Sequence, residues 1–199
     1  MATVSSRTMT AEEFHEWSCR PENQDKVYEL ERGEPVEMPP PSEQHGVVCA
    51  LVAHLLWKFI FQRGYGYVCS NDTGLLVAED PDTVRGPDLM LFGEARRLED
   101  LSRQFVARVP QLVVEVLSPS DQTGKVMRRL SQYLKRGVPL VWLVDPEVRI
   151  VTVYRPGREH QVVEETEELT GEEVLPGFRC RVAELFALPG PSGTKETDS

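Results

Sequence analysis

Two acidic residues of this 199-residue chain stand where carboxylates are uncommon, inside or beside apolar segments. Glu115 interrupts the apolar run LVVEVL at residues 112–117, and Asp88 opens the short apolar segment DLMLF. A continuous apolar run of this length is typical of a β-strand that is buried on both faces. An ionised carboxylate is costly to bury without a partner. We therefore expect Glu115 to be paired, protonated, placed at a strand end or bound to a metal.

Asp88 and Glu115 could meet at one point if the two segments are neighbouring strands. Two adjacent carboxylates repel each other unless they share a proton or hold a divalent cation. Such a cation suits phosphodiester hydrolysis, because it activates a water molecule and offsets the charge that develops on the phosphate. Loss of either carboxylate should then cost the metal-free protein little stability, since it relieves repulsion. The structural alternative is that Asp88 caps a turn and Glu115 pairs with an arginine.

A helix with basic residues follows the strand that contains Glu115. At 100° per residue, the apolar side chains of residues 121–136 fall in one arc, and the charged ones fall in the opposite arc. Gly137 ends this helix. Lys125 and Arg129 lie one turn apart on its polar face, so both are candidates for stabilising charge on a bound phosphate.

The elements that would position these groups follow from the hydrophobic pattern. Thr10 and Glu13 have the spacing of a capping box at a helix start. Residues 27–38 have the pattern of a β-hairpin. Residues 44–62 are apolar on nearly all sides, which predicts a buried helix. The strand around Glu115, the basic helix and a following apolar strand form a crossover unit, so we predict an α/β (α+β) fold with a mixed β-sheet.

Composition is typical of one soluble globular domain over residues 1–187, with a disordered tail over 188–199. The start of the chain lacks the pattern of a secretory signal, and the apolar stretch 47–57 is too short to span a bilayer. The four cysteines show neither zinc-site nor disulfide spacing. We therefore expect a cytoplasmic protein with reduced thiols and no membrane partner.

Net charge does not exclude nucleic acid as a partner, although the chain carries −10 overall. Residues 159–199 hold ten acidic and three basic residues, a net charge of −7, which leaves −3 for residues 1–158. A strongly acidic chain is not a general nucleic-acid coat protein. The main body, however, is close enough to neutral to bind nucleic acid.

Several segments together resemble one family. RGPDLMLF, LVVEVLSPSD and QYLKRGVPLVWLVDPEVRIVTVYRP are similar to segments of the Uma-type restriction-endonuclease-like family of bacteria, within the PD-(D/E)XK nuclease superfamily. MTAEEF, YELERGEPVEMPPPSEQHG and VLPGFRCRVAELF extend the resemblance over roughly residues 8–187. It implies a restriction-endonuclease-like core: a curved mixed β-sheet flanked by helices, preceded by an N-terminal helix and β-hairpin.

The resemblance also implies a magnesium site in which Asp88 is the aspartate of the PD element and Glu115 the acid of the (D/E)XK element. Mn²⁺ is the alternative metal. Glu29 corresponds to an acid that related nucleases bring to the metal site, although it could equally be an exposed hairpin residue. His45 corresponds to a family histidine, and a structural role is the alternative for it.

The lysine of the (D/E)XK element is missing, because Leu117 occupies its place. In the family this lysine is commonly displaced onto the following helix, where this chain has Arg129. Arginine holds its proton too firmly to act as a base. We therefore predict that Lys125 replaces the lysine functionally and that Arg129 assists at the phosphate.

These residues lead us to expect a Mg²⁺-dependent endodeoxyribonuclease, a hydrolase that acts on DNA. Two alternatives stay open. One is a catalytically impaired nuclease-fold module with a binding or regulatory role, for which Arg129 in place of lysine is the indication. The other is a structural homodimer.

Overall fold

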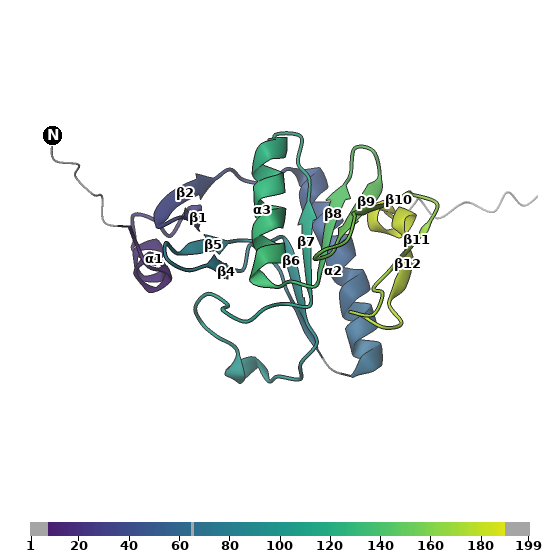
Figure 1. Cartoon of the computed structure of the whole chain (residues 1–199), viewed down its shortest axis with the longest axis horizontal. Helices are drawn as coiled ribbons and strands as arrows, with labels where there is room; N and C mark the ends of the chain where they lie inside the picture. The colour runs from purple at the N-terminus through teal and green to yellow at the C-terminus, as the bar shows by residue number, and fades with distance from the viewer. Residues whose placement is uncertain (1–7, 65, 190–199) are drawn as a thin grey trace, which may run out of the picture.

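The computed structural model of the chain describes residues 8–64 and 66–189 (Figure 1). The elements are, in order, α1 (Ala11–Ser18), β1 (Val27–Glu31), β2 (Glu34–Met38), α2 (Glu43–Arg63), β3 (Tyr67–Cys69), β4 (Leu75–Ala78), β5 (Thr83–Arg85), β6 (Leu89–Phe92), η1 (Leu98–Asp100), β7 (Leu112–Val116), α3 (Thr123–Arg136), β8 (Leu140–Asp145), β9 (Ile150–Tyr154), β10 (Gln161–Val163), β11 (Glu168–Thr170), β12 (Arg179–Arg181) and η2 (Val182–Phe186). The tail predicted to be disordered lies, from residue 190 on, outside the described residues.

Within the described residues the strands form three sheets, of which the largest is mixed. It has six strands in the order β10-β9-β8-β7-β6-β3, and β7 and β8 are its parallel pair, joined by the crossover helix α3. A second, antiparallel sheet has the order β2-β1-β5-β4, and β11 pairs with β12. The predicted α/β (α+β) architecture, with its N-terminal helix and hairpin, is confirmed.

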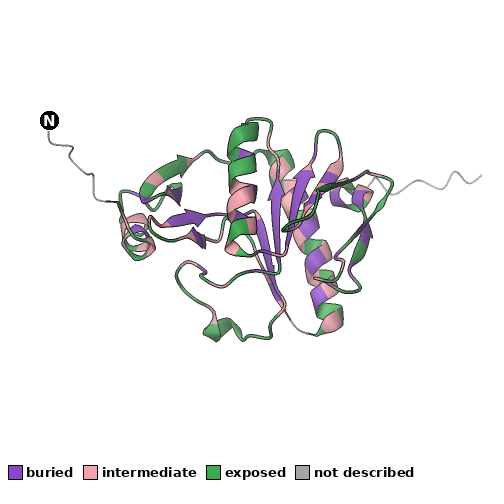
Figure 2. Ribbon diagram, in the orientation of Figure 1, coloured by how far each residue is buried: buried purple, intermediate pink, exposed green. Residues whose placement is uncertain are grey.

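Helices α2 and α3 cover opposite faces of the six-stranded sheet (Figure 1). Along β7, Val114 packs in the cluster that contains Val52 of α2, whereas Val113 packs in the cluster that contains Tyr133 of α3. Because successive strand residues point to opposite faces, Glu115 projects to the α3 side. All five residues of β7 are buried, as predicted for a strand covered on both faces (Figure 2).

Helix α2 differs from its prediction in how it is buried. Its bounds exceed the predicted ones by one residue at each end, but only one stripe is buried, at Val48, Val52, Leu56 and Ile60. With 21 residues, α2 is long and apolar enough to cross a membrane by length and composition, contrary to the estimate from the stretch 47–57. The core helix of a soluble protein meets the same test, and the buried stripe belongs to the main core.

The N-terminal elements follow their local sequence signals. The side chain of Thr10 accepts a hydrogen bond from the backbone N–H of Glu13, and the Glu13 carboxylate accepts one from the N–H of Thr10, so the capping box is confirmed. The hairpin turns at Gly33, where φ is +80°. A Cβ atom there would lie 2.3 Å from the Cβ of Thr8, so both conformation and space require glycine.

Strand β5 was not predicted, because its three residues are too few to show a period. It pairs with β1 and β4, and all three of its residues are buried. Its last residue, Arg85, is thereby placed beside Glu29 of β1.

Candidate active site

A cavity of about 390 Å³ is lined by residues of β1, the start of α2, the β5–β6 connection, the end of β7 and α3. Five sequence-predicted site residues line it together: Glu29, His45, Asp88, Glu115 and Arg129. They come from segments that are far apart in the chain, so the fold has assembled them. Lys125 does not line this cavity; it is exposed in the first turn of α3.

Asp88 immediately precedes β6, and its carboxylate has two fixed neighbours. One oxygen, Oδ2, accepts a hydrogen bond from the backbone N–H of Val116 at 2.7 Å. The other, Oδ1, lies 3.1 Å from Nε2 of His45. Strands β6 and β7 are antiparallel neighbours with Leu89 opposite Val114, and this register brings Asp88 to the end of β7 that carries Glu115.

The Glu115 side chain is buried and held by two groups of α3. It accepts a hydrogen bond from the Tyr133 hydroxyl, and its Oε2 lies 3.3 Å from Nη2 of Arg129. Burial raises the pKa of Glu115 to about 8; the Arg129 charge opposes this rise, and the Asp88 charge adds to it. Glu115 is therefore paired, and an additional positive charge nearby would favour its ionised form.

Glu29 is buried at 4% exposure, which excludes the alternative of an exposed hairpin acid. Its Oε2 accepts a hydrogen bond from Nη1 of Arg85 at 2.8 Å, and its Oε1 accepts one from the N–H of Gly86 at 2.9 Å. Nη2 of Arg129 lies 3.5 Å from Oε1. Arg85 in turn donates to Gln132 of α3. Glu29 thus ties β1 to β5 and to α3 at the cavity wall.

The substitution Glu29→Ala should lower the free energy of unfolding by about 3 kcal/mol, because it leaves the buried Arg85 without its main ionic partner. The measurement is urea denaturation in the absence of metal. The double variant Glu29→Ala with Arg85→Met should recover part of the loss, because the unpaired charge is then removed. A single variant as stable as the wild type would contradict a structural role for this pair.

Arg129 is the basic residue of α3 that lines the cavity, and Arg85 of β5 lines it as well. Burial alone would lower the pKa of its guanidinium, but the Glu115 charge, with Tyr133 and Glu29, raises that pKa above its ordinary value. Its buried Nε has no hydrogen-bond partner among the described residues. Arg129 therefore keeps its positive charge, and its Nε–H group can still donate a hydrogen bond beside Glu29 and Glu115. The predicted catalytic role of Lys125 stays a prediction.

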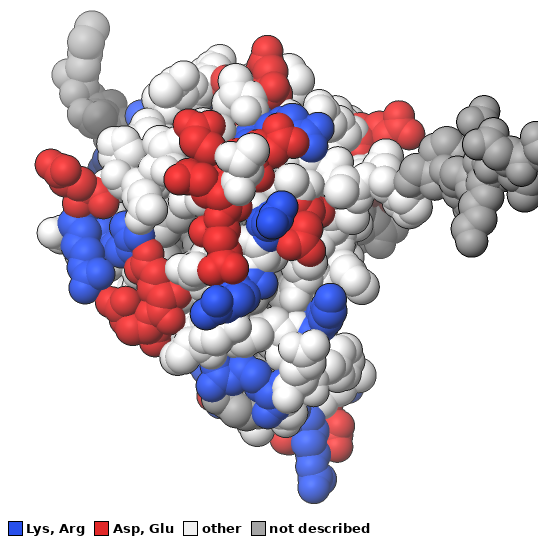
Figure 3. Space-filling view, turned by 90° about the vertical axis from the view of Figure 1, so that its right-hand side faces the viewer, with Lys and Arg blue, Asp and Glu red and all other residues white. Residues whose placement is uncertain are grey.

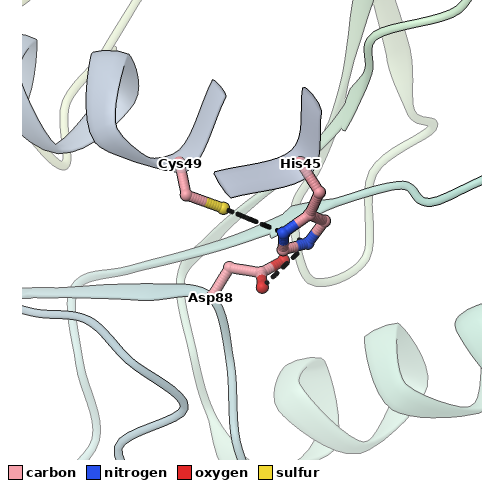
Figure 4. A group of neighbouring side chains, drawn as sticks. All are labelled: His45, Cys49 and Asp88. Carbon is pink, nitrogen blue, oxygen red and sulfur yellow. Dashed lines mark hydrogen bonds and ion pairs between the residues drawn. The ribbon is translucent and has the colours of Figure 1, made fainter. Parts of the chain in front are cut away.

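One neighbour at this site carried no sequence signal. Cys49 lies one helical turn after His45 on α2, and its sulfur is 3.5 Å from Nδ1 of the imidazole (Figure 4). His45, Cys49 and Asp88 each offer a ligand atom within 4.8 Å of the others. The spacing of His45 and Cys49 places them on one helix face, but only the docking of α2 against β6 adds Asp88.

The residues present fit a divalent cation. Asp88 and Glu115 supply carboxylate oxygens at the cavity wall, and the imidazole of His45 is adjacent. Carboxylate oxygens suit Mg²⁺ and Mn²⁺, and Mn²⁺ also accepts imidazole nitrogen. Sulfur is a soft ligand, so the Cys49 thiol is a poor partner for these hard cations. Asp88 and Glu115 are the better candidates for holding Mg²⁺.

Comparison with known proteins shows the family and the fold of the chain. The family model Uma2, described as "Putative restriction endonuclease", matches residues 11–183. A 1.96 Å crystal structure from Anabaena variabilis ATCC 29413, described as a putative nuclease belonging to DUF820, superposes with a TM-score of 0.72 at 22% sequence identity. The alignment covers 89% of this chain and 97% of that one, so the two share a fold. No curated protein matches significantly. The family match spans most of the chain, and the chain belongs to the Uma2 family.

Proposed function

We propose that this chain is a Mg²⁺-dependent endonuclease that hydrolyses phosphodiester bonds of DNA, with Mn²⁺ as an alternative metal. The observation that carries the proposal is the convergence of Asp88, Glu115 and Arg129 on one cavity. Two acids from neighbouring strands supply oxygen ligands, and the arginine supplies a permanent positive charge. Membership of the Uma2 family supports the nuclease class.

Each group has a distinct task in this proposal. Asp88 and Glu115 would hold the cation, which would acidify a water molecule and offset charge on the scissile phosphate. Arg129 would turn from Glu115 toward a phosphate oxygen, where its fixed charge stabilises the transition state. Tyr133 keeps the Glu115 carboxylate in place through its hydrogen bond. Glu29 would orient the Arg129 guanidinium through the contact between its Oε1 and Nη2 of Arg129, at 3.5 Å.

The direct test is cleavage of supercoiled and single-stranded DNA with Mg²⁺, with Mn²⁺ and with EDTA. Metal-dependent nicking or linearisation of the supercoiled substrate is the expected result. Cleavage that persists in EDTA would reject metal dependence, and cleavage of RNA in preference to DNA would reject the proposed substrate.

A catalytically impaired module that binds DNA is the second candidate. The observation that favours it is Arg129, which stands where the family resemblance implies a lysine, since arginine does not accept a proton near neutral pH. This candidate predicts metal-dependent stabilisation and DNA binding without cleavage. Homodimer formation and a cytoplasmic location stay predictions, and light scattering with size-exclusion chromatography measures the former.

DNA affinity should fall with rising salt, because Lys and Arg contacts to phosphates release condensed counterions. Figure 3 shows the side of the molecule that carries the C-terminal strands, where acidic side chains gather. Changing the four acids Glu164, Glu165, Glu167 and Glu168 to glutamine should strengthen binding by roughly threefold to tenfold at low salt.

This change removes long-range repulsion, and it also frees Arg149 and Arg179 from their ion pairs with Glu165 and Glu168. The difference between variant and wild type should disappear at high salt, where exposed charges are screened. Fluorescence anisotropy with a labelled duplex gives both affinities. Equal affinities at low salt would contradict the electrostatic account.

A further inference from the structure

The group formed by His45, Cys49 and Asp88 differs chemically from the site just proposed, because it contains a thiol (Figure 4). His45 and Cys49 lie on the same face of α2, because residues four apart in a helix share a face. The third member is Asp88, which immediately precedes β6 and whose Oδ1 lies 3.1 Å from Nε2 of His45. One nitrogen, one sulfur and one oxygen donor therefore meet at the wall of the same cavity, each on a half-buried residue.

The spacing of these atoms is close to that of a tetrahedral zinc site. Zinc bonds of about 2.0–2.3 Å place the ligand atoms of a regular tetrahedron roughly 3.3–3.6 Å apart. Nε2 of His45 lies 3.1 Å from Oδ1 of Asp88 and 4.0 Å from Sγ of Cys49. The sulfur lies nearer to the other ring nitrogen, at 3.5 Å from Nδ1. Because an imidazole binds a metal through the lone pair of one nitrogen, the ring or the Cys49 side chain must rotate before one ion contacts all three donors.

The donor types select the kind of ion. Thiolate and imidazole favour zinc and similar transition metals, whereas Mg²⁺ prefers oxygen ligands. Binding replaces the proton on the Cys49 sulfur with the metal and releases that proton to solvent. Three protein ligands leave the fourth tetrahedral position for water.

We infer that His45, Cys49 and Asp88 form a binding site for a borderline-soft divalent ion of the Zn²⁺ or Co²⁺ type. This site and the proposed Mg²⁺ site share Asp88. The Oδ2 atom of Asp88 is already occupied by the N–H of Val116, so Oδ1 is the oxygen left for a metal. The two ions therefore compete, and Zn²⁺ inhibits the nuclease; this consequence rests on the proposed function, whereas the binding site does not.

The binding site is tested with Co²⁺ alone, on the reduced full chain. A thiolate bound to Co²⁺ gives a near-ultraviolet charge-transfer absorption, which carboxylate and imidazole ligands do not give. We expect this band in the wild type and its loss in Cys49→Ser. The matched control is Cys69→Ser, a half-buried cysteine on β3 that is outside the group. The control variant keeps the band, and added Zn²⁺ abolishes it.

A wild type without the band, or a band that persists in Cys49→Ser, overturns the inference. Thermal melting without metal shows that each variant is folded. Competition between Zn²⁺ and Mg²⁺ for Asp88 is then measured. The readout is the rise in melting temperature that Mg²⁺ causes, with and without one equivalent of Zn²⁺. Zn²⁺ should suppress the rise in the wild type and in Cys69→Ser but not in Cys49→Ser. Cobalt binding without DNA cleavage in any protein would reject the proposed nuclease and leave the metal site established.

Discussion

The substitutions Asp88→Asn and Glu115→Gln should each reduce Mg²⁺-dependent DNA cleavage by at least about a hundredfold and abolish the stabilisation that Mg²⁺ gives. A hundredfold loss corresponds to about 2.7 kcal/mol of transition-state stabilisation, and metal ions commonly supply several kcal/mol. In the wild type, Mg²⁺ at a hundred times its dissociation constant should stabilise the fold by about 2.7 kcal/mol. For a chain of this length, that is a rise in melting temperature of about 5–10 °C.

The amide variants are chosen because they preserve the hydrogen bonds of each carboxylate. The side-chain oxygen of Asn at position 88 can still accept from the N–H of Val116, and Gln at position 115 can still accept from Tyr133. Each substitution removes the negative charge and replaces the second oxygen by an NH₂ group, beside His45 at position 88 and beside Arg129 at position 115. The control is Asp100→Asn, an exposed acid in η1 that does not line the cavity. Unchanged Mg²⁺ stabilisation in both amide variants would reject the metal assignment.

The stability that the metal-free protein loses when Asp88 or Glu115 is replaced by alanine cannot be judged from the sequence alone. Repulsion between two acids suggested that loss of either one would cost the metal-free protein little. The structure shows partners for both: Glu115→Ala would leave the buried Tyr133 hydroxyl and Arg129 without an acceptor. A buried polar group without a partner costs about 1–3 kcal/mol. We now expect alanine at Glu115 to be destabilising, because the partners, and not only the repulsion, determine its cost.

The convergence of Asp88 and Glu115 was predictable because it depends on local signals and a simple topology. Each acid is marked by the apolar strand that it adjoins, and strands β6 and β7 are neighbours in the sheet. Cys49 and Arg85 could not be found in this way. Arg85 lies in a three-residue strand without a detectable period, and Cys49 reaches the site only because α2 packs across the sheet. The packing of one element against a distant one cannot be predicted from residue spacing or composition.

A helical wheel could not show which of Lys125 and Arg129 reaches the cavity. It gives the angle of a side chain around the helix axis but not its position along that axis relative to a cavity. Both residues were predicted to lie on one polar face. In the structure, Arg129 lies over the end of β7 with its side chain at 17% exposure, whereas Lys125, one turn earlier, is exposed. The geometry thus favours the reverse of the predicted roles, with Arg129 central.

Replacement of Arg129 by alanine should therefore reduce cleavage by about a hundredfold to a thousandfold, the usual cost of removing one fixed donor to a developing negative charge. Arg129→Lys should retain most activity, because it keeps a positive charge at the cavity wall. Lys125→Ala should cost less than about tenfold, as expected for one solvent-exposed phosphate contact. The matched control is Arg128→Ala, an adjacent, exposed arginine that pairs with Glu31 outside the cavity.

Initial cleavage rates at saturating Mg²⁺ compare the four variants, and urea denaturation corrects for any loss of folded protein, which we expect chiefly for Arg129→Ala. A loss above a hundredfold in Lys125→Ala, with normal cleavage by Arg129→Ala, would restore the roles predicted from the sequence. If the wild type does not cleave but Arg129→Lys does, the chain is a nuclease disabled at one position. That result follows from proton chemistry: lysine can release and accept a proton at an accessible pKa, whereas the Arg129 guanidinium, whose pKa is raised by Glu115, holds its proton throughout.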